Sequence, residues 1–150
     1  MTFDIYRHRL PHARLEGAVY FVTWRLKEKH HPLSEPERDL VVSVLRHFDG
    51  LRYRLDAYVV MDDHVHVLAG PHSGFRLESI LHSWKSFSAK RIACRRQQAG
   101  AIWQEEYFDR VIWSCSEYAQ KRSYILTNPF RRWPDLQSYR WCWATGMESP

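Results

Sequence analysis

The sequence predicts an α+β fold, in which an antiparallel sheet has its helices packed on one face. Short runs rich in β-branched and aromatic residues alternate with longer segments whose apolar residues recur every three or four positions. Turn residues separate these segments, and their order is strand, helix, strand, strand, helix, strand, helix. With 150 residues, 45% of them apolar and 26% charged, residues 1–150 fit one globular domain.

The first strand and helix have clear boundaries. Residues Ala18–Leu26 (AVYFVTWRL) are β-branched, aromatic and apolar nearly throughout, which is typical of a central strand. A helix follows from Ser34, because Ser34 and Glu37 form a capping-box pattern with Pro36 in the first turn. The dipeptide Asp49-Gly50 ends that helix.

The middle of the chain predicts a hairpin and a long helix. Tyr53–Met61 (YRLDAYVVM) and His64–Ala69 (HVHVLA) are two strand-like runs separated by the turn residues Asp62 and Asp63. From Phe75 to about residue 98, apolar residues recur at helical spacing.

The last part of the chain predicts one more strand and one more helix. Residues Ala101–Trp113 are an irregular entry into a strand, and residues Ser114–Asn128 form a helix that Pro129 stops. The tail from about residue 130 is aromatic and basic without a period, so we expect it to wrap the domain. The whole order favours a ferredoxin-like two-layer sandwich.

Composition limits the function. Twenty-two Lys and Arg against 17 Asp and Glu give a net charge of +5, and with 15% aromatic residues this favours a nucleic-acid partner. Six of the tryptophans are expected to pack in the protein core rather than to stack on nucleobases.

Three cysteines without a CxxC pattern indicate neither a disulfide framework nor a zinc knuckle. No apolar segment is long enough to span a membrane, so we expect a cytoplasmic protein with no membrane partner.

The sharpest local motif is His64-Val65-His66. On a strand, side chains two positions apart project from the same face, so both imidazoles point to one place while Val65 points into the core. Two imidazoles are the start of a divalent metal site with open coordination positions. A pair of surface histidines has the same sequence pattern.

Tyr124 and Asn128 form a second pair. They lie four positions apart before Pro129, hence on one face of the expected helix. Asn supplies a neutral oxygen ligand, and Tyr supplies an oxygen nucleophile that needs a metal-polarised electrophile. Without the histidines, a helix-terminal Asn and a core Tyr explain this pair equally well.

The histidine and tyrosine motifs occur in the same order as in a known protein family. The run Tyr58–Leu68 (YVVMDDHVHVL) resembles the HUH segment of single-tyrosine transposases, usually written VVMPxHxH. Lys85–Lys90 (KSFSAK), Trp103–Ile112 (WQEEYFDRVI) and Tyr124–Pro129 (YILTNP) resemble further blocks of REP-associated tyrosine transposases, an IS200-like group. The likeness extends from Arg9 to about Trp143. Two features depart from the family pattern, namely Asp62 at a position usually occupied by proline and the absence of a glycine shortly after Asn128-Pro129.

The resemblance implies a metal-dependent enzyme that nicks and joins single-stranded DNA, often at hairpins. By that analogy Tyr124 is the nucleophile, His64 and His66 are metal ligands, and Asn128 is the third ligand. The product would be a 5′-phosphotyrosine bond and a free 3′-hydroxyl. Imidazole and carbonyl ligands suit Mg²⁺ and Mn²⁺ alike. Related transposases include dimers and monomers, so both a monomer and a homodimer are open.

Neighbouring residues suggest supporting roles. Asp63 is a candidate to accept a hydrogen bond from a ligand imidazole, although it is also a common turn former. Tyr107 is a rival nucleophile, but its neighbours Trp103 and Phe108 favour packing or base stacking. Candidate DNA-binding cations that could follow the phosphates are Lys85, Lys90, Arg91, Arg95, Arg96, Arg131 and Arg132.

Two other functions fit the same sequence. One is a catalytically silent regulatory module that binds hairpins of DNA or RNA, since a basic and aromatic composition serves binding as well as cutting. The other is a metal-dependent phosphodiesterase that releases its product to water without a covalent intermediate. A test for a trapped tyrosine adduct distinguishes both of these functions from the transposase hypothesis.

Overall fold

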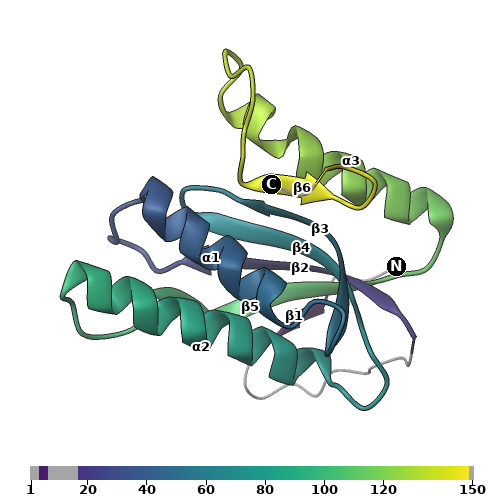
Figure 1. The fold of residues 1–150 in the computed structure, drawn as a ribbon, viewed down its shortest axis with the longest axis horizontal. Coiled ribbons are helices and arrows are strands. Elements are labelled where there is room, and N and C mark those ends of the chain that lie inside the picture. Colours follow the sequence, from purple (N-terminus) through teal and green to yellow (C-terminus); the bar gives the residue numbers. More distant parts are fainter. Residues whose placement is uncertain (1–3, 7–16, 149–150) are drawn as a thin grey trace.

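In the computed structural model, which describes residues 4–6 and 17–148, six strands form one antiparallel sheet with three helices. The strand order across the sheet is β1-β5-β2-β4-β3-β6 (Figure 1). The elements are β1 (Asp4–Tyr6), β2 (Val19–Leu26), α1 (Glu35–His47), β3 (Tyr53–Val60), β4 (His64–Pro71), α2 (Leu77–Arg96), β5 (Trp103–Ile112), α3 (Cys115–Arg132) and β6 (Cys142–Ala144).

The four inner strands and the first two helices confirm the predicted ferredoxin-like arrangement. Chain order β2-α1-β3-β4-α2-β5 gives the spatial order β5-β2-β4-β3, in which every pair is antiparallel. The sequence did not predict the two outer strands, β1 beside β5 and β6 beside β3, because three residues are too few to show a period.

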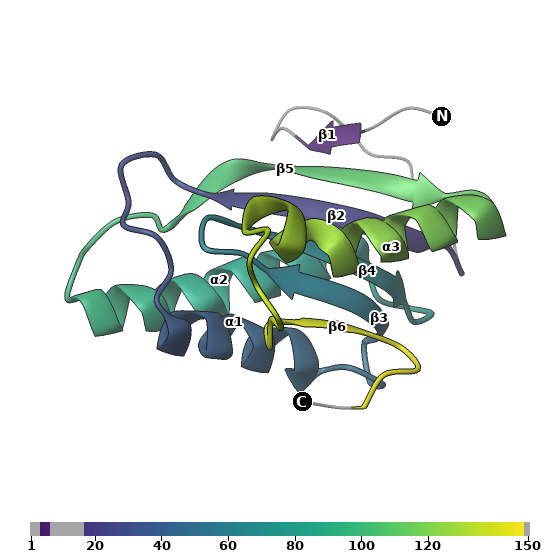
Figure 2. The same cartoon turned by 90° about the horizontal axis from the view of Figure 1, so that it is seen from above.

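The placement of α3 corrects the expectation that all helices lie on one face of the sheet. Helices α1 and α2 lie together on one face, whereas α3 lies on the other (Figures 1 and 2). The reason is the apolar character of the inner strands on both sides. Val65 and Val67 of β4 pack toward α1 and α2, while Leu68 joins a second cluster with Ile125 of α3. A sheet with two apolar faces needs cover on both.

Buried tryptophans fill the larger core between the sheet and helices α1 and α2. Trp24 and Trp84 stack with ring centroids 5.9 Å apart, and the Trp84 indole donates a hydrogen bond to the Tyr53 hydroxyl at 3.0 Å. The expected core role therefore holds for most of the tryptophans. Trp113 is 62% exposed and Trp133 is half-buried, so these two do not follow that expectation.

An internal ion pair joins α1 to α2. Ser34 and Glu37 form the predicted capping box, and the Glu37 carboxylate also receives two hydrogen bonds from the Arg96 guanidinium, at 2.7 and 2.9 Å. Arg96 further donates to the carbonyl oxygens of His31 and Pro32. Its hydrogen bond and charge, opposed in part by burial, lower the pKa of Glu37 from 4.5 to about 2.

Replacing Glu37 with glutamine is expected to lower the free energy of unfolding by about 2 to 3 kcal/mol at neutral pH, because the partly buried guanidinium of Arg96 loses its charged partner. A carboxylate whose pKa is depressed in the folded state stabilises the fold above its ordinary pKa of 4.5, and this contribution is lost as the pH falls toward about 2. Urea titrations over that pH range should show that the gap, which is the difference in unfolding free energy between the unaltered protein and Glu37→Gln, becomes smaller as the pH falls. The control is Glu35→Gln, an exposed acid in the same turn. A gap that is independent of pH would contradict the assignment.

Helix α3 continues through Pro129 to Arg132, so the expectation that it stops at Asn128 is wrong. A proline inside a helix has no N–H to give the carbonyl four residues earlier, here that of Ile125. The thiol of Cys142 in β6 donates to this carbonyl with an Sγ to O distance of 3.5 Å. Burial raises the pKa of Cys142 to about 12, so the thiol stays protonated and remains a donor. The tail thus completes the helix as well as the sheet.

Candidate active site

The two histidines of β4 lie side by side on the face of the sheet that α3 covers. Their ring centroids are 4.7 Å apart, and Val65 between them points into the opposite core as predicted. His64 is 8% and His66 is 4% exposed. The alternative interpretation as surface histidines is therefore wrong. Two buried imidazoles on a central strand need another explanation, because buried polar groups normally have partners.

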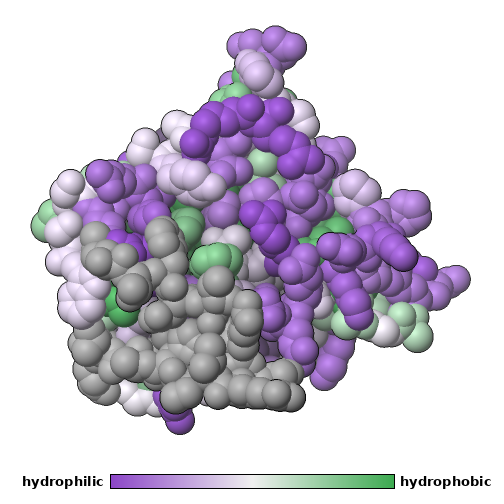
Figure 3. All heavy atoms as spheres, turned by 180° about the vertical axis from the view of Figure 1, so that it is seen from behind, coloured by the Kyte–Doolittle hydropathy of each residue, from purple (hydrophilic) through white to green (hydrophobic). Residues whose placement is uncertain are grey.

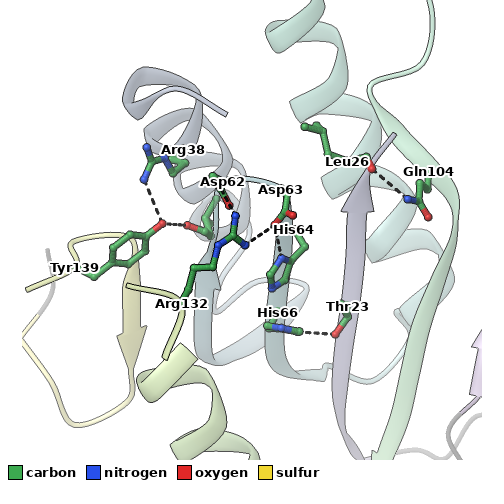
Figure 4. Close-up of polar contacts among 11 residues, drawn as sticks. Thr23, Leu26, Arg38, Asp62, Asp63, His64, His66, Gln104, Arg132 and Tyr139 are labelled. Atoms are coloured by element: carbon green, nitrogen blue, oxygen red, sulfur yellow. Dashed lines mark hydrogen bonds and ion pairs between the residues drawn. The ribbon is translucent and has the colours of Figure 1, made fainter. Parts of the chain in front are cut away.

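Each histidine is held through its Nδ1 atom. His64 Nδ1 lies 2.6 Å from a carboxylate oxygen of Asp63, which is the predicted contact between Asp63 and an imidazole. His66 Nδ1 lies 2.6 Å from the hydroxyl of Thr23 on the adjacent strand (Figure 4). When Nδ1 carries the proton in both rings, each Nε2 atom presents a lone pair.

The environment disfavours the charged form of both rings. Burial lowers the pKa of His64 below its ordinary value, although the hydrogen bond and charge of Asp63 oppose this. Burial, together with the charges of His64 and nearby cations, lowers the pKa of His66 well below its ordinary value. Neutral imidazole is the form that binds a metal ion.

Tyr124 of α3 lies directly beside this pair. Its ring centroid is 5.2 Å from that of His66 and 6.0 Å from that of Phe21, whose ring stacks on His66. The residue is 38% exposed, so Tyr124 is open to a substrate from solvent. The guanidinium of Arg131 lies 4.6 Å from the Tyr124 ring centroid. The structure therefore brings together the imidazoles and the phenol that the sequence separates by about sixty positions.

The buried Nε2 atom of His66 has no hydrogen-bond partner among the described residues, which fits a position reserved for a metal ion. Asn128 is half-buried one turn after Tyr124 on α3. Within residues 4–6 and 17–148, no three side chains of His, Cys, Asp or Glu gather as a metal site. The structure thus brings two imidazole donors together, and Asn128, on the same helix as Tyr124, stays a prediction as the third ligand.

Three cations surround the histidines. Arg25, Lys121 and Arg131 all contribute positive potential at His66 and so help to lower its pKa. Sequence reasoning named Arg131 but missed Arg25 and Lys121. A signal existed for Arg25, which shares a strand face with Thr23 in the otherwise apolar β2 and pairs with His64 across the sheet. Positive charge here suits an anionic substrate such as a phosphodiester.

The predicted basic surface is divided by the sheet. Arg131 and Arg132 lie on α3 by the histidines, while the other five cations lie on α2, on the opposite face. Lys90, Arg91 and Arg95 are exposed there. Arg96 is not an exposed phosphate ligand, because its guanidinium is tied to Glu37. Lys85 is also held internally, donating to the carbonyl oxygens of Gln104 and Glu105 at 2.7 and 3.1 Å.

Arg132 connects α3 to the turn before the histidines. Its guanidinium lies 3.1 Å from an Asp62 oxygen and 3.7 Å from an Asp63 oxygen (Figure 4). Asp62, which departs from the family pattern, thus gains a partner on the tyrosine-bearing helix. Burial would raise the pKa of Asp63, but the hydrogen bond and charge of His64 and the charge of Arg132 hold it below its ordinary value.

Tyr107 lies on the far side of the sheet. It is 6% exposed and belongs to the core under α1 and α2, with Lys85 Nζ 5.8 Å from its ring centroid. The geometry therefore separates Tyr107 from the histidine pair and favours Tyr124 as the partner of the imidazoles.

The chain is similar to a known protein family and to solved structures. The model of the family described as "Transposase IS200 like" matches residues 15–127. No curated protein matches the chain. Among solved structures, a REP-associated tyrosine transposase bound to a REP hairpin has a TM-score of 0.70 and 19% identity, covering 85% of this chain and 75% of that one. A proposed transposase from Deinococcus radiodurans R1 has a TM-score of 0.55 and 23% identity, covering 78% and 95%.

The fold and the matched family define the class of protein, a DNA-processing enzyme of the transposase kind. The chain belongs to the IS200-like transposase family. Across the described residues, the helices are all too short or too polar to cross a membrane.

Proposed function

We propose that the protein nicks and rejoins single-stranded DNA at hairpin or palindromic sequences, with Tyr124 as the nucleophile. The observation that carries this proposal is the position of the Tyr124 ring, whose centroid lies 5.2 Å from that of His66 in the buried imidazole pair. The structural relative bound to a REP hairpin supports DNA as the partner. Where residues are coloured in Figure 3, the face of the molecule turned away in Figure 1 is mostly hydrophilic, with small separate apolar patches.

The reaction is an exchange of phosphoesters. The Tyr124 oxygen bonds to the scissile phosphorus, the bond from phosphorus to the 3′ oxygen breaks, and the 3′ oxygen takes up a proton while the phenol loses its own. The products are a 5′-phosphotyrosine and a free 3′-hydroxyl, which can reverse the step. No water or nucleotide is consumed. Tyr124 is partly exposed, so solvent is available to take up its proton.

A divalent cation, Mg²⁺ or Mn²⁺, held by His64, His66 and Asn128 would polarise the scissile phosphate when bound. The residues of the chain orient the imidazoles and supply positive charge. Asp63 and Thr23 fix the two imidazole rings, and burial disfavours their charged form. Arg25, Lys121 and Arg131 place positive charge where phosphate oxygens would lie.

The test uses hairpin oligonucleotides with unpaired, randomised flanks, incubated with the protein and Mn²⁺ or Mg²⁺. A 5′-phosphotyrosine retains the downstream part of the DNA, so a label on the 3′ end should remain with the protein in a denaturing gel. A label on the 5′ end should be released on a fragment that ends in a 3′-hydroxyl. Digestion and mass spectrometry should place the adduct on Tyr124.

Other results of this experiment would replace the proposal. Cleavage that turns over without an adduct would indicate a hydrolytic phosphodiesterase. Tight binding to hairpins without cleavage in either metal would indicate a regulatory binding module. An adduct that retains the 5′ label would reverse the proposed polarity.

Replacing Asp63 with asparagine is expected to lower the nicking rate by about 10- to 100-fold and to raise the Mn²⁺ concentration that gives half the maximal rate. The physical reason is that an amide is a weaker acceptor than a carboxylate, so His64 loses orientation and basicity. The matched control is Asp62→Asn, which changes the neighbouring carboxylate that contacts Arg132 but no imidazole. Equal effects of the two variants would mean that the turn, not the histidine contact, is important.

A further inference from the structure

A cleft of about 820 Å³ lies between α1 and the segment that follows α3. Its walls come from the first turn of α1 and from residues 132–141, and we call it the tail cleft. Aromatic rings and guanidinium groups make up most of its lining. They are Trp133, Tyr139 and Trp141, with Arg38, Arg132 and Arg140.

The aromatic rings of the tail cleft are held in fixed positions. Trp133 and Tyr139 stack with centroids 5.7 Å apart, and Tyr139 meets Trp141 edge-on at 5.1 Å. The Tyr139 hydroxyl donates to the Val60 carbonyl at 2.6 Å and accepts from Arg38 at 3.2 Å. Trp141 is buried, whereas Trp133 and Tyr139 are only half-buried. The cleft therefore offers aromatic surface that does not have to be ordered when a ligand binds.

The arginines of the tail cleft are paired with acids or packed on aromatic rings. The Arg38 guanidinium lies 4.2 Å from the Trp141 ring centroid, and its buried Nε has no hydrogen-bond partner among the described residues. Arg140 pairs with Asp39 at the rim. Glu35 and Asp135 also line the cleft, so the cations are locally balanced rather than in large excess. Aromatic rings alternating with arginines are the usual platform for unpaired bases.

The tail cleft adjoins the candidate active site. Arg132 lines the cleft and also contacts Asp62 and Asp63, and Asp63 holds His64 (Figure 4). A base in the cleft would therefore belong to a nucleotide close to the phosphate at Tyr124. Bases in the interior of a duplex have both faces covered by their neighbours, so an unpaired base is the ligand that suits an exposed ring best.

We propose that the tail cleft is a stacking subsite for an unpaired nucleobase of DNA that flanks the scissile phosphate. This inference rests on the proposed function, since it assigns part of the same substrate. It gives Trp133 and Tyr139 a role in choosing where the strand is cut relative to the hairpin stem.

The experiment is abasic scanning of a DNA hairpin with unpaired flanks, with affinity measured by fluorescence anisotropy in the absence of metal. In the unaltered protein, removing the base at one flank position is expected to weaken binding about tenfold. In Trp133→Leu the intact DNA should bind about tenfold more weakly, and the abasic change at that position should then have no further effect. Affinity for a hairpin trimmed of its flanks should not change.

The matched control is Trp113→Leu, the same substitution at a tryptophan that is 62% exposed at the far end of α3. If Trp133→Leu does not fold, as judged by thermal unfolding, Arg38→Met tests the same cleft from α1. Abasic effects that are equal in the unaltered protein and in both cleft variants would overturn the inference. Because no metal is present, that result is distinguishable from failure of the nicking reaction, which the adduct assay reports.

Discussion

Tyr124→Phe is expected to abolish the covalent protein–DNA adduct and to lower the nicking rate by about 10⁴-fold or more, because phenylalanine has no oxygen to bond to phosphorus. Hairpin affinity should stay within about twofold, since the change removes one hydroxyl from a partly exposed side chain. The measurement is the 3′-label adduct assay together with anisotropy on the same DNA.

The matched control for this change is Tyr107→Phe, because Tyr107 lies in the core on the other face of the sheet. That variant should form the adduct at an undiminished level. Loss of the adduct in Tyr107→Phe with retention in Tyr124→Phe would reassign the nucleophile and refute the interpretation of the site. Loss in both would require a check of folding by circular dichroism before any role is assigned.

The second large effect is expected for His66→Ala. Removing the buried imidazole takes away the Nε2 lone pair proposed to bind the metal ion. The nicking rate should therefore fall by at least about 10²-fold at any Mn²⁺ concentration. A readout independent of activity is stability. Mn²⁺ that binds only the folded protein should add about 2.7 kcal/mol at a hundredfold excess over its Kd, and this gain should disappear in the variant.

The control for His66→Ala is His82→Ala, an exposed histidine on α2. It should keep both the nicking rate and the stabilisation by Mn²⁺. Because His66 is buried, the variant is also expected to be less stable without metal, so the comparison is made between gains on adding metal. An unchanged gain in His66→Ala would remove this residue from the metal site.

Much of the fold could be predicted because its inner elements have strong local patterns. Local patterns predict these elements directly. Examples are the apolar run of β2, the capping box at Ser34 and the alternation in β4. The face on which α3 packs could not be predicted in the same way, since helical periodicity shows which side of a helix is apolar but not which sheet face receives it. The carbonyl of Ile125, which Pro129 leaves without its helical donor, accepts from Cys142, a partner that no local pattern reveals.

The candidate site was predictable in part for the same reason. His64, His66, Tyr124 and Asn128 are short-range pairs whose spacing shows a shared face, so the pairs themselves could be found. Whether the pairs meet is a tertiary property, and the structure brings Tyr124 to His66. The positions of basic residues in the sequence were the least reliable predictor of the site. Arg96 has the same charge as Arg25, but only the fold shows that the first is an internal link and the second lies by the histidines.

The state of the cysteines makes conformational experiments on this protein practical. Cys142 is protonated and partly shielded beneath α3, whereas Cys94 on α2 and Cys115 at the start of α3 are exposed. Thiol-reactive fluorophores or spin labels should therefore attach to these two positions first, without any engineered mutation. Since the two positions lie on helices that flank the sheet from opposite sides, a distance measured between them would report any displacement of the tyrosine-bearing helix when DNA binds.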